Sequence, residues 1–184
     1  MQQQQGGLQV SVHGHPNADT LLLWHPAVAS DPDGVAALAS RIATRSSVRV
    51  VVPVWTPGST GSAGRDLLRS VRFARESAVH PPDSMSVVGY GDAGIAALSL
   101  AQHQRRLGIG LSRVTCVDGG PDLADPISGQ PLGAPAPAPV ETAVDVVDTG
   151  DGWARSTVES WAAAGWAATL VPADQFTWRV SPSQ

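Results

Sequence analysis

Several side chains that could do chemistry follow apolar runs in this chain. One such run ends at Val88, a turn of small residues spans 89–94, and an apolar stretch from Ile95 onward predicts a helix. Asp92 lies in that turn. A carboxylate in such a place can attack a substrate and form a covalent intermediate. It can also accept the free amide hydrogens at the start of the helix. The capping role is favoured, and the nucleophile remains the alternative.

The order of strand, glycine-rich turn and helix resembles the nucleophile elbow of the α/β-hydrolase family. Gly89 and Tyr90 match the glycine and the spacer of that motif, so Gly91 stands where the family usually has its serine. A glycine has no side chain and cannot attack anything. A second register puts Asp92 at the apex, where epoxide hydrolases and haloalkane dehalogenases have an aspartate. Tyr90 then occupies a position that should be small.

The resemblance also implies where the acid and the base of a triad should lie. Asp151, in the turn after the strand expected at 143–147, best matches the position of the acid. The family's histidine follows the last strand, but residues 172–180 contain none. His25 directly follows the strand at 20–24, where the resemblance implies a residue that holds the oxyanion loop. Ala27 or Val28 could donate an oxyanion amide there, whereas Pro26 has no amide hydrogen.

Loops that follow parallel strands meet at one edge of the sheet, and ligands bind at that edge. This places aromatic rings beside carboxylates and predicts a ligand-binding set of Trp55, Tyr90, Gly91, Asp118 and Trp153. Such a mixture suits a small polar aromatic ligand or a loop of a partner protein, and the carboxylates would repel a phosphate. The proline-rich segment 118–139 is too short for a helical lid, which predicts an open pocket. A plain core role for both tryptophans is the alternative.

The apolar periodicity alternates between strand-like and helix-like segments along the chain. Strands are expected at 8–12, 20–24, 48–54, 86–88, 114–117, 143–147 and 167–171, and helices at 32–45, 64–78, 93–107 and 153–164. This alternation predicts an α/β fold, a three-layer sandwich with a mostly parallel sheet and helices on both faces. Residues 8–184 are predicted to form a single domain, after a flexible tail at 1–7.

Composition excludes several kinds of chemistry. The net charge is −4 and the chain has no lysine, which excludes a Schiff-base lysine and a P-loop lysine. The single Cys116 permits no internal disulfide. His13 and His15 could bind a metal but lack further ligands, so a solvated turn is favoured and no metal or cofactor is expected. The polar residues 1–7 do not resemble a signal peptide, and the sequence contains no apolar run of about 20 residues, so a cytoplasmic protein is expected.

Two functions remain open at this stage. The first is a non-catalytic binding or assembly partner, which explains the glycine at the elbow and the missing late histidine together. The second is an enzyme of altered chemistry, of the hydrolase, lyase or cyclase type. It would use Asp92 as nucleophile or base, together with Asp151 and with His25 or another histidine. The balanced charge disfavours nucleic-acid and membrane partners. A stripe of Arg65, Arg69 and Arg72 could meet an acidic partner or be a solvated helix face, and the oligomeric state stays open.

Overall fold

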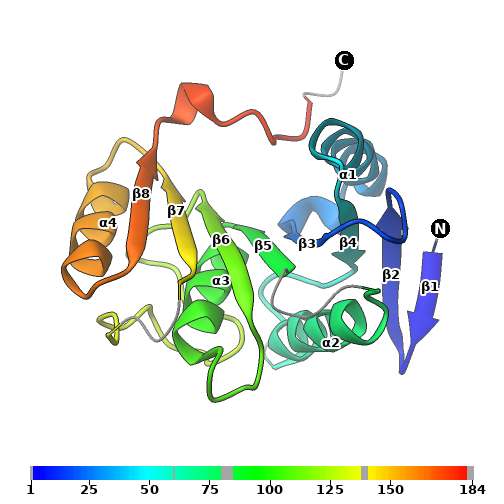
Figure 1. Ribbon diagram of the computed structural model, residues 1–184, viewed down its shortest axis with the longest axis horizontal. Coiled ribbons are helices and arrows are strands. Elements are labelled where there is room, and N and C mark those ends of the chain that lie inside the picture. Colours follow the sequence, from blue (N-terminus) through cyan, green and yellow to red (C-terminus); the bar gives the residue numbers. More distant parts are fainter. Residues whose placement is uncertain (1, 60, 80–84, 138–140, 182–184) are drawn as a thin grey trace.

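The structure is a computed structural model that describes residues 2–59, 61–79, 85–137 and 141–181. Eight strands form one sheet in the order β1-β2-β4-β3-β5-β6-β7-β8 (Figure 1). β1 and β2 pair antiparallel, β2 pairs antiparallel with β4, and all other neighbours are parallel. The strands are β1 (Gln2–Gln5), β2 (Leu8–His13), β3 (Thr20–Trp24), β4 (Arg49–Pro53), β5 (Met85–Tyr90), β6 (Leu111–Val117), β7 (Ala143–Val147) and β8 (Ala167–Val171).

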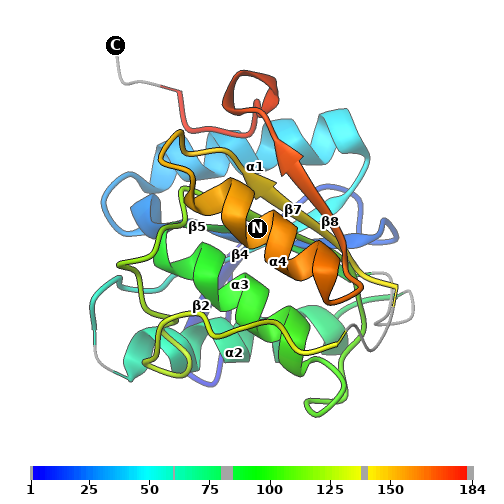
Figure 2. The same ribbon diagram turned by 90° about the vertical axis from the view of Figure 1, so that its left-hand side faces the viewer.

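Helices cover both faces of this sheet, which confirms the predicted three-layer α/β sandwich. The α-helices are α1 (Pro32–Ser46), α2 (Ser62–Glu76), α3 (Asp92–His103) and α4 (Trp153–Ala163). Figure 2 shows α1 on one face and the other three on the opposite face. All residues of β3 and β4 are buried, as expected for parallel strands covered on both sides. Among the described helices, none is long and apolar enough to cross a membrane.

The local signals for α1 are confirmed in detail. Asp31 is its N-cap, and its Oδ1 accepts a hydrogen bond from the amide of Gly34 at 3.0 Å. Pro32 takes the first helical position, where its missing N–H is not needed. Leu38 and Ile42 are fully buried against the sheet. The capping chemistry and the apolar spacing therefore position this helix together.

The start of the chain differs from the expected flexible tail. Residues 2–5 form strand β1, with Gln5 opposite Leu8. Gly6 and Gly7 connect the two strands, and both have positive φ angles, of 58° and 87°. A two-residue turn of this kind matches the twist of a β-hairpin and favours glycine at both positions. The pair of glycines is thus the sequence signal for a hairpin, although the polar composition of residues 1–7 favoured a flexible tail.

A segment without regular strands follows β8 and crosses the top of the molecule toward α1 (Figure 1). We call residues 172–181 the C-terminal segment. It begins with the short 3-10 helix η3 (Ala173–Gln175) and continues as irregular chain. Phe176, Trp178 and Val180 from this segment pack against the hydrophobic core. The residues that follow the last strand therefore form part of the packed structure.

Candidate functional site

The turn between β5 and α3 has the backbone shape expected of a nucleophile elbow. Gly91 is its apex, with φ 61° and ψ −128°, a conformation that residues with a side chain rarely adopt. Its amide donates a hydrogen bond to the carbonyl of Val117 at 2.8 Å, which ties the turn to the end of β6. A Cβ built on Gly91 meets no atom within 4 Å. The apex therefore has room for a side chain that the sequence does not supply.

Asp92 does not occupy the apex of this turn. It is the first residue of α3, and Gly91 takes the N-cap position without any side-chain hydrogen bond. The expected N-cap role of Asp92 is therefore wrong by one residue, because the strained apex uses the capping position. A carboxylate in the first helical turn is still favourable, since it faces the positive end of the helix dipole.

His25 and Tyr90 lie together at the carboxyl ends of β3 and β5. Their ring centroids are 4.4 Å apart. Nδ1 of His25 accepts a hydrogen bond from the amide of Ala27 at 3.1 Å, and the His25 carbonyl accepts from Val28 at 3.3 Å. The amide of Ala27 is a donor, so the neutral imidazole holds its proton on Nε2. His25 thus holds the loop, and both expected oxyanion amides already have partners within it.

Burial changes the acid–base properties of both rings. It lowers the pKa of His25 below its ordinary value, and the carboxylates of Asp118 and Asp31 offset part of this effect. Burial raises the pKa of Tyr90, which is only 3% exposed. The Tyr90 hydroxyl donates to the carbonyl of Trp178 at 2.5 Å. At neutral pH the His25 ring is therefore neutral and the Tyr90 hydroxyl keeps its proton.

Asp118 follows β6 and binds the C-terminal segment. Its carboxylate pairs with Arg179 at 3.1 Å, and the Arg179 guanidinium also lies 5.6 Å from the ring centre of Phe176. Arg41 of α1 donates to the backbone carbonyl of Arg179 at 2.7 Å. The segment is therefore fastened to the elbow strand, to the loop after β6 and to α1. An open pocket was expected, but the C-terminal segment lies over part of the sheet. The described part of 118–137 contains no helix.

Asp151 and Trp153 have structural roles in the loop before α4. The Asp151 carboxylate accepts hydrogen bonds from the Thr149 hydroxyl at 2.5 Å and from the Trp153 amide at 3.1 Å. The Thr149 bond is the main cause of its lowered pKa. The Trp153 ring packs so closely on Gly119 that a Cβ there would lie 2.8 Å from it. The Asp151 side chain therefore shapes its own turn, and the Trp153 ring supports the loop after β6.

Trp55 was expected to line the ligand site, but it belongs to the core. Its side chain is 1% exposed. Within the described residues its indole N–H has no hydrogen-bond partner. Besides His25, the ring that lies beside Tyr90 is that of Phe176, and the ring of Trp178 lies beside Phe176 in turn. The alternating aromatic residues Phe176 and Trp178 after the last strand are the sequence signal for this contact with Tyr90.

A pocket of about 320 Å³ lies between the C-terminal segment and the sheet. One wall consists of Phe176 and Trp178, and the sheet contributes Val88 and Thr115. The ion pair of Arg113 and Asp145 also lines it. The side chains of the sheet that line the pocket come from the face that carries α1 (Figure 2). The helix α1 itself packs mainly on β2 and β4 rather than on the strands that line the pocket. This pocket lies on the face of the sheet, whereas the order of strands and loops in the sequence points only to the sheet edge.

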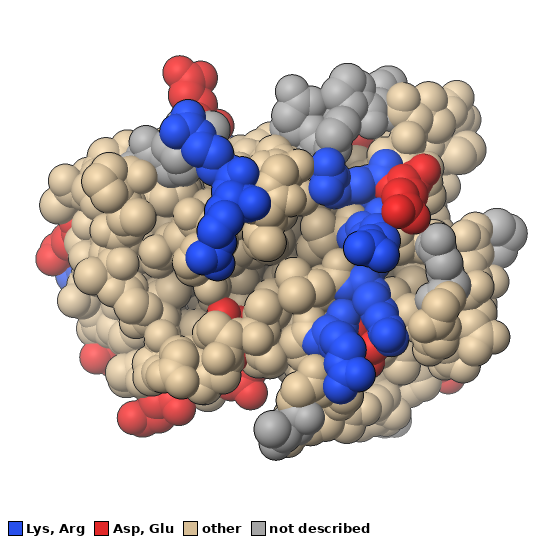
Figure 3. Space-filling view, turned by 90° about the horizontal axis from the view of Figure 1, so that it is seen from below, with Lys and Arg blue, Asp and Glu red and all other residues tan. Residues whose placement is uncertain are grey.

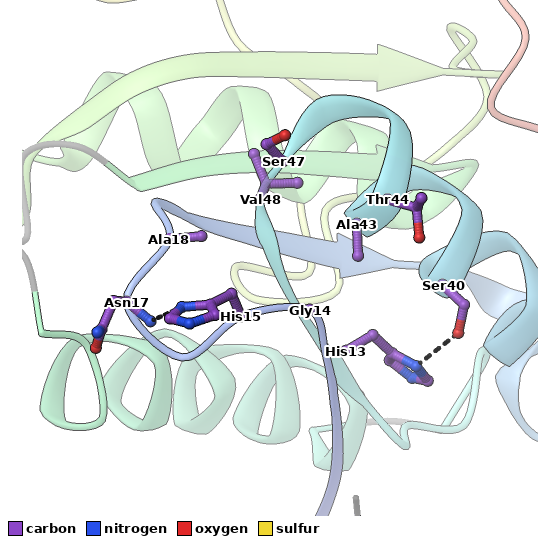
Figure 4. Close-up of a pocket in the computed structure, with 10 residues that line it drawn as sticks. All are labelled: His13, Gly14, His15, Asn17, Ala18, Ser40, Ala43, Thr44, Ser47 and Val48. Carbon is purple, nitrogen blue, oxygen red and sulfur yellow. Dashed lines mark hydrogen bonds between the residues drawn. The ribbon is translucent and has the colours of Figure 1, made fainter.

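His13, the last residue of β2, and His15, which follows that strand, do not converge. They line a separate pocket of about 650 Å³ at the amino ends of β3 and β4. His13 contacts the hydroxyls of Ser40 and Ser11 at 3.1 and 3.2 Å, while His15 accepts from the amide of Asn17 (Figure 4). Among the described residues no three metal-ligating side chains lie close enough to hold an ion. His80 lies outside the described residues.

Comparison with known proteins identifies the fold. No family model and no curated protein sequence matches the chain. Solved structures match over nearly its whole length. An esterase/lipase from an uncultured bacterium is 13% identical with a TM-score of 0.68, covering 94% of this chain and 74% of its own. An esterase from the bacterial hormone-sensitive lipase family is 17% identical with a TM-score of 0.64, covering 94% and 73%.

A third match is an α/β-hydrolase enzyme from a Medee basin deep-sea metagenome library. It is 13% identical with a TM-score of 0.60, covering 92% of this chain and 77% of its own. Together with the strand order and the elbow geometry, these likenesses show that the chain has the α/β-hydrolase fold. At such identities they establish the fold and leave the function to the site residues.

Proposed function

We propose that this chain is a non-catalytic binding protein with the α/β-hydrolase fold. One observation carries the proposal: the elbow keeps the strained apex of a nucleophile turn, but the residue at that apex is Gly91. The loop that directly follows β8, residues 172–181, contains no histidine, so the base is missing from the place where this fold usually carries it. The members of a catalytic triad act as a unit, and loss of two of them removes nearly all of the acceleration.

The alternative enzyme would need Asp92 and a base. His25 is a poor base, because its unprotonated nitrogen already accepts a hydrogen bond and its other nitrogen carries the proton. Asp151 is fully exposed and bonded within its own turn. Asp118 is paired with Arg179. His25, Asp151 and Asp118 thus each have a structural partner, which leaves Asp92 without a suitable base and supports binding without chemistry.

The bound molecule would occupy the pocket between the C-terminal segment and the sheet. Its volume of about 320 Å³ lies at the lower end of the range for ligand pockets. The walls of Phe176, Trp178 and Val88 suit a flat apolar ring, while Arg113 and Asp145 offer a donor and an acceptor side by side. A flat aromatic molecule with a neutral group that both donates and accepts, such as a carboxamide, complements this lining.

Esterase assays test the missing chemistry. The unmodified protein should hydrolyse p-nitrophenyl acetate at the background rate. Gly91→Ser should also stay at background, since no base is supplied, and should lose about 1–3 kcal/mol of stability because a side chain must adopt the strained apex. Rapid turnover by the unmodified protein would overturn the proposal, and its loss in Asp92→Ala would establish the alternative.

Binding of 2-naphthamide tests the pocket. Saturation-transfer NMR and tryptophan fluorescence should detect the amide. 2-Naphthoate should bind more weakly, because Asp145 already neutralises Arg113 and a carboxylate has no N–H to donate to Asp145. Ser86→Phe places a ring in the pocket and should abolish binding. Ser160→Phe makes the same change on the exposed side of α4 and should leave binding intact. Equal binding to both variants would show that the pocket is not the site.

A further inference from the structure

A groove with an apolar floor lies between α2 and α3. These two helices cover the face of the sheet opposite α1 and the pocket described above (Figure 2). One part has a volume of about 510 Å³, and a smaller part of about 120 Å³ adjoins it through three shared residues, Leu68, Leu100 and Leu107. Leu68 and Leu107 are 37% and 45% exposed. Large aliphatic side chains at this exposure, lining one recess, indicate a surface that has a partner.

Arginines border this groove on both sides. Arg72 and Arg75 of α2 line one part, and Arg106, which follows α3, lines the other. Figure 3 shows basic side chains gathered in two bands with uncharged surface between them. We call this combination of apolar floor and basic borders the arginine groove. Glu76 and the buried Asp125 also line the groove, so its exposed border is mainly basic rather than of a single charge.

The charge of the groove opposes that of the remaining chain. Six of the twelve arginines lie in α2 or at 105–106, together with two carboxylates, Asp66 and Glu76. The rest of the chain has six arginines against fourteen carboxylates, so a protein of net charge −4 carries one clearly basic surface. Asp66 approaches Arg69 at 3.7 Å. An arrangement of this kind steers an oppositely charged partner toward one face.

We propose that the arginine groove binds an acidic amphipathic segment of another protein. Such a segment would place aliphatic side chains on Leu68 and Leu107 and carboxylates beside the flanking arginines. Aliphatic contacts favour a peptide over a nucleic acid, which would stack its bases on aromatic rings. This binding site goes beyond the proposed function and lies at a different place in the molecule.

A second copy of this chain is a poorer occupant. Its described helices offer no acidic amphipathic face: α1 contains Asp33 with Arg41 and Arg45, α4 contains Glu159 with Arg155, and α3 contains Asp92 alone. The fourth helix, α2, itself carries the basic residues. The complementary charge must therefore come from a different polypeptide.

The test uses a labelled helical peptide of about 18 residues, long enough to form a helix, with leucines on one face and glutamates elsewhere. A matched peptide has lysine in place of glutamate. Fluorescence anisotropy should detect the acidic peptide alone, and the binding should weaken in about 0.5 M salt, which screens surface charges. Arg72→Glu with Arg106→Glu should weaken it at least about tenfold. Leu107→Asp should do the same.

Arg155→Glu is the control, because it reverses an exposed charge outside the groove. Circular dichroism confirms that each variant is folded. Affinity for the acidic peptide that stays unchanged in the groove variants, or that is weaker than about 1 mM, overturns the proposal. So does a self-association detected by sedimentation that Leu107→Asp abolishes, or binding to a DNA duplex or to phosphatidylglycerol vesicles that the same variants remove.

Discussion

Glycines at the elbow differ in what they permit. A Cβ on Gly89 would lie 2.1 Å from the carbonyl oxygen of Ala93, so this position must stay small. A Cβ on Gly94 would lie 2.8 Å from the sulfur of Cys116. Gly91 alone of these three has open space around it together with a positive φ angle. The turn thus has glycine at the two positions where a side chain would clash, and also at the one position with room for a side chain.

His25 makes stability depend on pH. Its folded-state pKa is lower than the ordinary 6.5, so the unfolded chain binds the proton more readily. The free energy of unfolding should therefore fall as the pH drops below about 6.5, and it should be fully present above that value. Urea unfolding at about pH 7.5 and about pH 5.5 measures this difference. The carboxylates of Asp118 and Asp31 oppose the effect and reduce its size.

The variant His25→Asn separates titration from structure, because the asparagine side chain can still accept the amide of Ala27. It should fold and lose part of the difference between the two pH values. His13, whose pKa burial also lowers, should supply the remainder. An unchanged pH dependence in His25→Asn would show that His25 does not contribute to it.

At the scale of elements, the C-terminal segment covers the pocket on the face of the sheet. Tyr90→Phe removes the hydroxyl that donates to Trp178 and should lower the free energy of unfolding by about 1 kcal/mol. Hydrogen exchange followed by mass spectrometry should show that residues 172–181 exchange faster in Tyr90→Phe than in the unmodified protein, while exchange in the strands is unchanged. Asp174→Asn, an exposed change within the same segment, is the control. Equal protection in both variants would mean that the hydroxyl does not hold the segment.

For the whole molecule, the sequence predicted the fold well because its signals are local and repeated. Buried strands such as β3 are continuous apolar runs, and α1 begins where Asp31 and Pro32 indicate. The candidate site was harder to predict from the sequence, because its contacts join residues that are far apart in the chain. Nothing near Tyr90 indicates that its hydroxyl meets Trp178, and nothing near Asp118 indicates Arg179. Trp55 shows the reverse error, since a position after a strand does not tell whether a ring faces the core.

The bond from Arg41 to the carbonyl of Arg179 has a consequence for folding kinetics. It joins residues 138 positions apart, and the bond from Tyr90 to Trp178 joins residues 88 apart. The entropy of closing such long loops must be overcome before these contacts stabilise anything. The sheet and its helices should therefore assemble first. The docking of the C-terminal segment onto the sheet should be among the last events in folding. Until that moment Phe176 and Trp178 remain in water, which makes the late intermediate the species most prone to aggregate.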